Sequence, residues 1–153
     1  RGGDKAELQI VVSDGLNALS LMDDGHLEPY LASLRTELQR RGHTVAPELI
    51  VVNGGRVRFG YRAGELLFGK LADPQARRGI IHVIGERPGN MHHTFSAYIT
   101  VLPASDWGVA GRVDHNMTRV VSGIADTALA SAAAALATVK IIDELSARPA
   151  LGR

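Results

Sequence analysis

Two opposite charges stand between two glycines in the segment GERPG, residues 85–89. This segment directly follows an apolar run, residues 80–84, whose composition is typical of a strand buried by helices on both faces. In open α/β sheets, ligands bind at the carboxyl ends of the strands. We therefore expect the Glu86 carboxylate to be directed at a ligand. The alternative is a polar surface turn in which Glu86 and Arg87 contact only each other.

Two further strand ends have the same character. Residues 13–17 (SDGLN) and residues 53–57 (NGGRV) also combine small residues with side chains that donate or accept hydrogen bonds. Small residues let a ligand approach the backbone closely. If the three strands are parallel, their loops lie at one edge of the sheet, and that edge is the predicted binding site.

The signatures of common nucleotide enzymes are absent from these loops. No GxGxxG segment follows the first strand, and the chain contains no GxxxxGK[ST] segment. This pattern disfavours a free-standing NAD or ATP enzyme. A stand-alone nucleotide- or phosphate-binding domain that uses the same loops stays open as an alternative.

Other polar groups give weaker indications of chemistry. His92, His93 and His115, together with Asp114, are residue types that bind metals. Because adjacent residues of an extended chain point to opposite sides, loop hydrogen bonds are the favoured interpretation of these side chains. The acidic pair at residues 23–24 is interpreted as a solvated lead-in to the next helix. No GxSxG segment is present, and the lack of cysteine excludes a thiol nucleophile and a thiolate metal site. With the histidines interpreted as loop residues, we predict neither a catalytic residue nor a metal site.

The segment DHNMTRVVSGIADTALA, residues 114–130, is more specific than a connecting loop requires. It joins a polar beginning and Arg119 to a central Ser-Gly pair and an end rich in small residues. A short helix with its caps is the simpler interpretation, and the residue types alone do not decide between that helix and a binding segment.

The spacing of apolar residues predicts the elements that position these segments. Residues 26–41 have helical spacing, with Pro29 suited to the first turn and Gly42 to the end of the helix. Residues 94–102 alternate between two unlike faces, and the eight residues before them are too few for a parallel crossover. We therefore expect an antiparallel edge strand there. The other predictions are strands at residues 8–13, 47–52 and 80–84, helices at residues 63–71 and 130–145, a short strand or ordered loop at residues 56–59, a polar connection at residues 73–79 and a loop at residues 103–116.

The order strand, helix, strand, helix, strand is typical of a right-handed, mostly parallel sheet covered by helices. The predicted fold class is α/β, a Rossmann-like three-layer α/β/α arrangement with an antiparallel edge strand. We expect one domain over residues 1–153, with a core at residues 8–145 between a flexible N-terminal tail and a C-terminal tail at residues 146–153.

Composition and charge exclude several classes of partner. Seventeen Lys and Arg stand against sixteen Asp and Glu, and the basic residues form no stripe, so nucleic acid is not an expected partner. No apolar run approaches the roughly 20 residues of a membrane span. The chain has no cysteine, and its start has no signal-peptide apolar region, which favours the cytoplasm. Because the first residue is Arg rather than Met, we expect a further segment ahead of it.

Several segments, taken together, resemble the small subunit, or light chain, of ethanolamine ammonia-lyase. The similarity extends in chain order from about residue 8 to about residue 145, and it rests on QIVVSDGLNA, GGRVRFGYRAGELL, HVIGERPG, HHTFSAYIT and DHNMTRVVSGIADTALA. SDGLNA and IGERPG, with the GRV segment between them, are specific in combination. The resemblance implies an adenosylcobalamin-dependent lyase that converts ethanolamine to acetaldehyde and ammonia by a radical route.

The resemblance also implies a partner and a location. In this family a TIM-barrel large subunit holds the substrate and most catalytic groups, and the small subunit packs against it in a hetero-oligomer and helps enclose the cobalamin. It therefore implies a non-catalytic subunit that is inactive alone, in the free cytoplasm or in a bacterial microcompartment. Family light chains usually have a further N-terminal region ahead of the QIVVSDGL strand.

Carried over by position, the resemblance assigns cobalamin contacts to Val57 in GGRV, Glu86 in IGERPG and Val120 in TRVVSG. Other family members can have Cys at the position of Val120, whereas this chain has none. A contact made by the backbone survives this difference, and a contact that needs the thiol does not. A purely structural partner domain stays open as a third hypothesis, and the resemblance assigns no role to Arg87.

Overall fold

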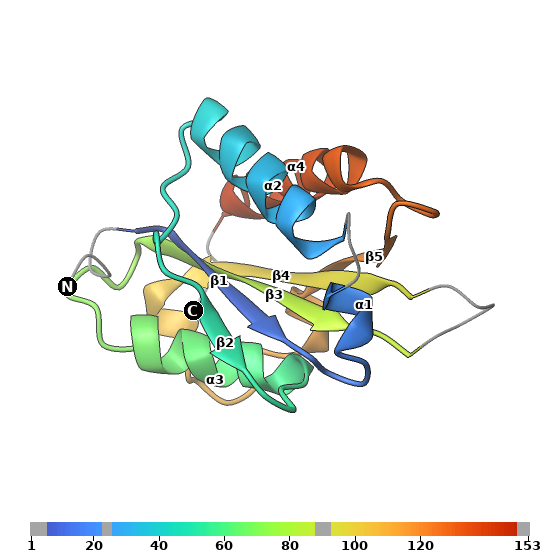
Figure 1. Ribbon diagram of the computed structural model, residues 1–153. Helices are drawn as coiled ribbons and strands as arrows, with labels where there is room; N and C mark the ends of the chain where they lie inside the picture. The colour runs from blue at the N-terminus through green and yellow to red at the C-terminus, as the bar shows by residue number, and fades with distance from the viewer. Residues whose placement is uncertain (1–5, 23–25, 88–92, 150–153) are drawn as a thin grey trace.

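The computed structural model describes residues 6–22, 26–87 and 93–149. These residues form one five-stranded sheet with helices on both faces (Figure 1). The strands are β1 (Leu8–Ser13), β2 (Ile50–Val52), β3 (Arg77–Gly85), β4 (Phe95–Pro103) and β5 (Arg119–Ile124). The α-helices are α1 (Leu19–Met22), α2 (Leu27–Arg40), α3 (Val57–Phe68) and α4 (Ser131–Ser146), and the 3-10 turns are η1 (Ala104–Asp106) and η2 (His115–Met117).

The sheet is mixed, in the order β2-β1-β3-β4-β5. β1 pairs in parallel with β2 and β3, whereas β4 is antiparallel to both β3 and β5. The antiparallel orientation predicted for residues 94–102 is confirmed. The prediction that this strand forms the edge is wrong, because β5 pairs with its outer side. Because β5 is antiparallel to β4, it runs in the same direction as β1, β2 and β3, so β4 is the one described strand that runs against the others.

One face of the sheet carries α2 and α4, and the other face carries α3 (Figure 1). Tyr30, Leu34 and Leu38 of α2 are completely buried in the larger apolar cluster, which also contains the inward side chains of α4. Burial of each such side chain stabilises the fold by about 1.5–3 kcal/mol. The predicted helices at residues 26–41 and 130–145 are confirmed, and α2 is followed, as expected, by Gly42 in the left-handed region with φ of 81°.

Helix α3 is longer at its start than predicted. The sequence favoured a strand or loop at residues 56–59, but Val57–Phe68 is one helix, so both alternatives are wrong. Gly60 and Gly64 each cost about 1 kcal/mol in a helix interior relative to Ala, so the sequence pattern did not predict the first turns of this helix. In the fold both glycines permit close packing, because a methyl group at Gly64 would overlap the Trp107 indole.

Smaller differences concern the ends of elements. The strand predicted at residues 47–52 is confined to Ile50–Val52, and the predicted polar connection at residues 73–79 ends in the first three residues of β3. The segment 114–130 contains η2, strand β5 and a loop, so the short-helix interpretation is wrong for its centre. The predictions for residues 23–24, for His92 and for residues 1–5 and 150–153 of the tails lie outside the described residues.

Across residues 6–22, 26–87 and 93–149, no helix has both the length and the apolar character needed to cross a membrane.

Candidate functional site

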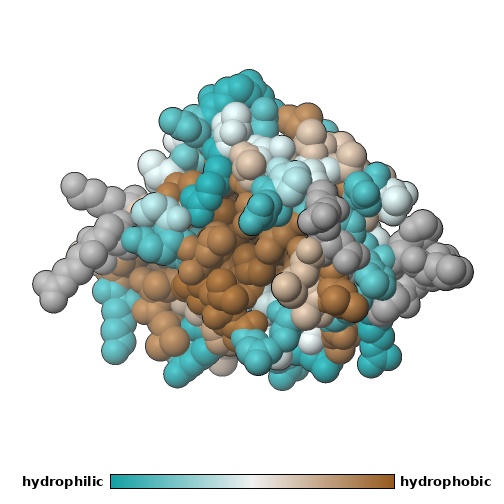
Figure 2. Space-filling model, viewed as in Figure 1, coloured by the Kyte–Doolittle hydropathy of each residue, from teal (hydrophilic) through white to brown (hydrophobic). Residues whose placement is uncertain are grey.

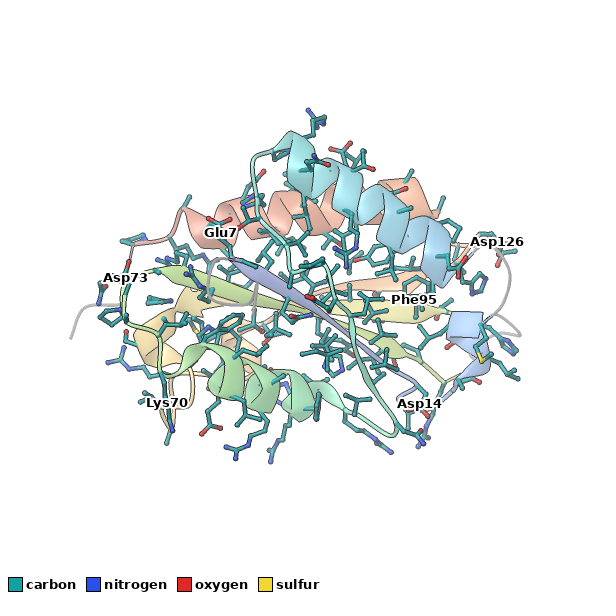
Figure 3. The ribbon with its side chains drawn as sticks, turned by 60° about the vertical axis from the view of Figure 1, so that its left-hand side comes forward. Glu7, Asp14, Lys70, Asp73, Phe95 and Asp126 are labelled. Atoms are coloured by element: carbon teal, nitrogen blue, oxygen red, sulfur yellow. The ribbon has the colours of Figure 1, made fainter. Side chains whose placement is uncertain are left out.

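Three loops meet at the carboxyl edge of the parallel strands. The N–H of Gly54, after β2, donates to the carboxylate of Asp14, after β1, at 2.5 Å. The N–H of Leu16 donates to the carbonyl of Gly85, at the end of β3, at 3.1 Å. Figure 3 shows Asp14 at this edge and Asp73 at the opposite end of the sheet. The predicted meeting of the three strand ends is therefore confirmed.

A buried Ser–His pair lies beneath this edge. The Ser13 hydroxyl donates its one proton to the Gly55 carbonyl at 2.9 Å, so it accepts a hydrogen bond from the Nε2–H of His82 at 2.8 Å. Burial lowers the pKa of His82 to about 4, and the backbone carbonyl of Val57 acts weakly in the opposite direction. The imidazole is therefore neutral and already protonated on the nitrogen that faces Ser13. This pair joins β1, β3 and the β2–α3 loop and does not activate the serine as a nucleophile.

Val57 is the first residue of α3 and is half-buried. The helix begins directly over His82, because a Cβ atom at Gly60 would lie 3.0 Å from the His82 Nδ1 atom. A larger side chain at that position would push the start of α3 away from the sheet. The position of Val57 therefore depends on the absence of a side chain at Gly60.

Glu86, directly after β3, is held by a tyrosine of the neighbouring strand. The Tyr98 hydroxyl donates to Glu86 Oε1 at 2.9 Å. Burial, and next the hydrogen bond to Glu86, raise the pKa of Tyr98 to about 12, so the phenol keeps its proton and remains the donor. The other carboxylate oxygen, Oε2, has no hydrogen-bond partner within the part of the chain that the structure describes. Glu86 therefore has one oxygen available to a ligand.

Val120 lies directly opposite Tyr98 in the β4–β5 ladder, and His82 lies opposite Tyr98 on its other side. Directly paired residues share a face of the sheet, so these three side chains form a row on the α3 face. Val120 is 46% exposed. The structure thus gathers the three predicted contact residues around two others: the backbone carbonyl of Val57 lies near His82, Glu86 bonds to Tyr98, and Val120 pairs with Tyr98 in the sheet.

A second tyrosine ties α3 to β5 beside this row. The Tyr61 hydroxyl lies 2.8 Å from Thr118 Oγ1, and Thr100 Oγ1 lies 2.9 Å from the same atom. Because the Thr118 hydroxyl donates to the Asp114 carbonyl, it accepts from Tyr61. Burial raises the pKa of Tyr61 above its ordinary value. The ring of His115 stands 6.0 Å from that of Tyr61.

Arg56, Arg58 and Arg87 are exposed at the same edge. Their guanidinium groups form no hydrogen bond or ion pair with any residue in the described ranges. Glu86 bonds to Tyr98 instead of Arg87, so the alternative in which Glu86 and Arg87 only contact each other is wrong. Pro88 and Gly89 of the same segment lie outside the described residues.

His93 and His115 are the described histidines among those that suggested a metal. Within the ranges that the structure covers, no group of three or more His, Cys, Asp or Glu side chains is arranged to hold a metal ion. Asp114 accepts hydrogen bonds from Asn116 and caps η2, while His115 is exposed.

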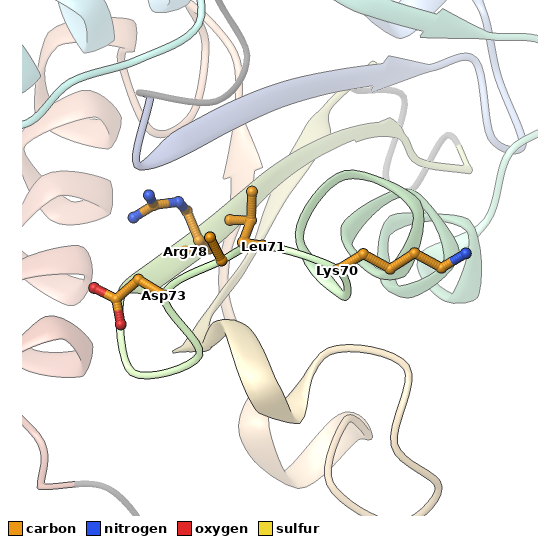
Figure 4. A pocket seen from close by; sticks show the side chains of 5 residues that line it. Lys70, Leu71, Asp73 and Arg78 are labelled. Carbon is orange, nitrogen blue, oxygen red and sulfur yellow. The ribbon is translucent and has the colours of Figure 1, made fainter.

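Other concave surfaces are lined by residues outside the row. A cavity of about 430 Å³ at the opposite end of the sheet is lined by Lys70, Leu71, Ala72, Asp73 and Arg78. Figure 4 shows Lys70 pointing away from Arg78, so the two cations do not converge on one ligand. A second cavity of about 290 Å³ adjoins strand β2 and is lined in part by the exposed Val51. Figure 2 shows apolar side chains gathered on this side of the molecule.

The sequence interpretation missed His82 and Tyr98 as members of the site, and it missed Tyr61 as the tyrosine that joins α3 to β5 beside it. A usable signal existed for Tyr98, because the alternation in TFSAYITVL places it on the polar face of its strand. No comparable signal existed for Tyr61, since its helix was not recognised at that position.

The profile of one protein family, described as ethanolamine ammonia-lyase light chain (EutC), matches residues 2–152. The chain belongs to the ethanolamine ammonia-lyase light-chain family. An ethanolamine ammonia-lyase small subunit from Pseudomonas syringae pv. tomato is 34% identical over 98 residues, which cover 63% of this chain and 30% of that protein. One from Xanthomonas campestris pv. campestris is 35% identical over 102 residues, 66% of this chain and 34% of that protein. Each match thus spans about a third of the curated light chain's length.

Proposed function

We propose that this chain helps enclose the adenosylcobalamin of an ethanolamine ammonia-lyase, which converts ethanolamine to acetaldehyde and ammonia. One observation carries the proposal: Glu86 and Val120 lie on either side of Tyr98 on one face, in a chain of this family. Glu86 and Val120 are 34 positions apart in the sequence, and the pairing of β3, β4 and β5 brings them together on one face of the sheet.

The residues present fit such a cofactor. A corrin ring is broad and largely apolar, and its rim carries amide groups that donate hydrogen bonds. The exposed Val120 side chain offers an apolar surface, and the free Oε2 atom of Glu86 offers an acceptor for an amide N–H. No charged side chain of the row would be buried unpaired against the apolar part of the ring.

When bound, adenosylcobalamin supplies the radical chemistry, and the protein binds and orients it. In this proposal Glu86 accepts an amide hydrogen bond, while Val57 and Val120 exclude water. Ser13 and His82 hold the loops in place and take no part in bond making. A chain with this task needs no catalytic residue and is inactive alone.

The proposal includes a partner, a fold assignment and a location. A TIM-barrel large subunit covers the cofactor face in a hetero-oligomer, with the exposed Arg56, Arg58 and Arg87 at the rim. Helices on both faces of a sheet with three parallel strands support a Rossmann-like three-layer arrangement in one domain over residues 1–153. The proposed location of the enzyme is the cytoplasm, either free or in a microcompartment.

The test uses this chain co-purified with a large subunit of the family. Cobalamin binding is followed by its absorbance, and acetaldehyde release is measured with ethanolamine and adenosylcobalamin. Glu86→Ala removes a charged acceptor, so we expect cobalamin affinity to fall about tenfold or more.

The matched control is Glu144→Ala, which removes an exposed carboxylate from α4. This variant should bind cobalamin as the wild type does. The proposal is wrong if the large subunit alone binds cobalamin as tightly, and releases acetaldehyde as fast, as the complex with this chain.

A further inference from the structure

Tyr98 occupies the centre of the candidate cofactor face. Its backbone is fixed on both sides, because it pairs with His82 of β3 and with Val120 of β5. Side chains of β4 alternate between the faces, so Tyr98 lies on the α3 face while its neighbours Ala97 and Ile99 are buried in the larger core on the other face. From this position its hydroxyl reaches the Glu86 carboxylate, directly after the end of β3.

The backbone of Glu86 is also fixed, because its N–H donates to the Thr94 carbonyl at 3.1 Å. Its side chain is free to rotate except where Tyr98 holds it. A free carboxylate on this half-exposed position would lose rotamer freedom on binding a ligand, which weakens binding. The hydrogen bond from Tyr98 to Oε1 removes that freedom in advance.

No neighbouring donor is placed to take over from Tyr98. The nearby Tyr61 hydroxyl is bonded to Thr118. The Arg87 guanidinium makes no ion pair with Glu86 although it is next in the chain. Among the residues that the structure describes, Tyr98 is thus the one side chain that holds Glu86.

We propose that Tyr98 is a positioning residue for the cobalamin contact, which directs Oε2 of Glu86 at an amide of the cofactor by occupying Oε1. The inference rests on the proposed function and extends it to a residue that makes its contribution through Glu86. Tyr98 has no role in bond making, and its phenol proton stays on the oxygen throughout.

The test is a double-mutant cycle in the complex of this chain with a large subunit, read as equilibrium binding of hydroxocobalamin and of adenosylcobalamin by absorbance. Tyr98→Phe should weaken binding about fivefold to tenfold, as expected for a lost hydrogen bond to a charged group. In a Glu86→Ala background the same change should weaken binding by less than about twofold, because Tyr98 then has nothing to hold.

Two further variants keep the test decisive. Tyr61→Phe removes a phenol hydroxyl from the same face and should leave affinity within about twofold. Glu86→Asp keeps the charge but withdraws the carboxylate from Tyr98, so it should weaken binding as much as Tyr98→Phe does. In the Glu86→Asp background, Tyr98→Phe should cause no further loss of affinity. Circular dichroism and thermal unfolding of each chain establish that it is folded.

The outcomes separate this inference from the proposed function. If the wild-type complex binds no tighter than the large subunit alone, the proposed function is wrong. If Glu86→Ala weakens binding but Tyr98→Phe does not, or if Tyr98→Phe weakens it equally in both backgrounds, only the positioning role is overturned.

Discussion

His82 donates its Nε2–H to the Ser13 hydroxyl 2.8 Å away, and the same hydroxyl donates to the Gly55 carbonyl. This chain of hydrogen bonds joins β3, β1 and the loop before α3 beneath the candidate cofactor edge. Burial keeps the imidazole neutral by lowering the pKa of His82 to about 4. The pair therefore couples the stability of the site to pH.

Stability should fall as the pH drops from about 6.5 to about 4, because an unfolded chain protonates its histidine near pH 6.5 and the folded chain does so only near 4. Below this window the loss attributable to His82 amounts to about 3 kcal/mol. Denaturant unfolding at a series of pH values measures it. His82→Gln should show a correspondingly smaller loss over the same window, and an unchanged slope would contradict the assignment.

Gly64→Ala should destabilise the chain by about 1–3 kcal/mol, because the new methyl group overlaps the buried Trp107 ring. The higher helix propensity of Ala offsets only about 1 kcal/mol of this cost. Chemical denaturation gives the difference in unfolding free energy. Leu66→Ala, on the exposed side of the same helix, should change it by less than about 0.5 kcal/mol. Trp107→Leu should destabilise the Gly64→Ala variant by less than it destabilises the wild type. Equal costs in the two backgrounds would argue against the overlap.

Tyr30 and Thr138 join α2 to α4 in the larger core, with their hydroxyl oxygens 2.9 Å apart. The Thr138 hydroxyl donates to the Ala134 carbonyl, so Tyr30 is the donor in the pair. Thr138→Val should cost about 1–3 kcal/mol, because it leaves the Tyr30 hydroxyl buried without an acceptor. The double variant with Tyr30→Phe should be more stable than Thr138→Val alone in denaturant unfolding. Simple additivity of the two single changes would show that the hydroxyls are not coupled.

Val120→Glu should weaken cobalamin binding by the complex at least about tenfold, since it places a charge against the apolar part of the ring. Leu136→Glu is the matched control, because Leu136 on α4 has the same exposed fraction of 46%. Absorbance titration of both variants measures the effect. Equal affinities would remove Val120 from the cofactor face.

The sequence by itself determined the elements that carry a long, local pattern. β1, α2 and α4 were predictable because their apolar spacing, together with Pro29 and Gly42, reports on burial and chain direction without reference to distant partners. The convergence of the strand ends was also predictable, since parallel strands end at one edge of a sheet. Glu86 was a candidate for the same local reason.

Only the tertiary structure decided the start of α3, the edge strand and the surroundings of Glu86. Two glycines weaken the helical pattern of α3, and what stabilises the helix is packing against Trp107 and His82, residues far along the chain. β5 is the edge strand because residues 119–124 pair with the outer side of β4, and the local pattern of neither segment reveals that pairing. The bond from Tyr98 to Glu86 depends on the register that sets Gly85 opposite Phe95, and register arises from the pairing of two strands, which neither strand's sequence contains alone.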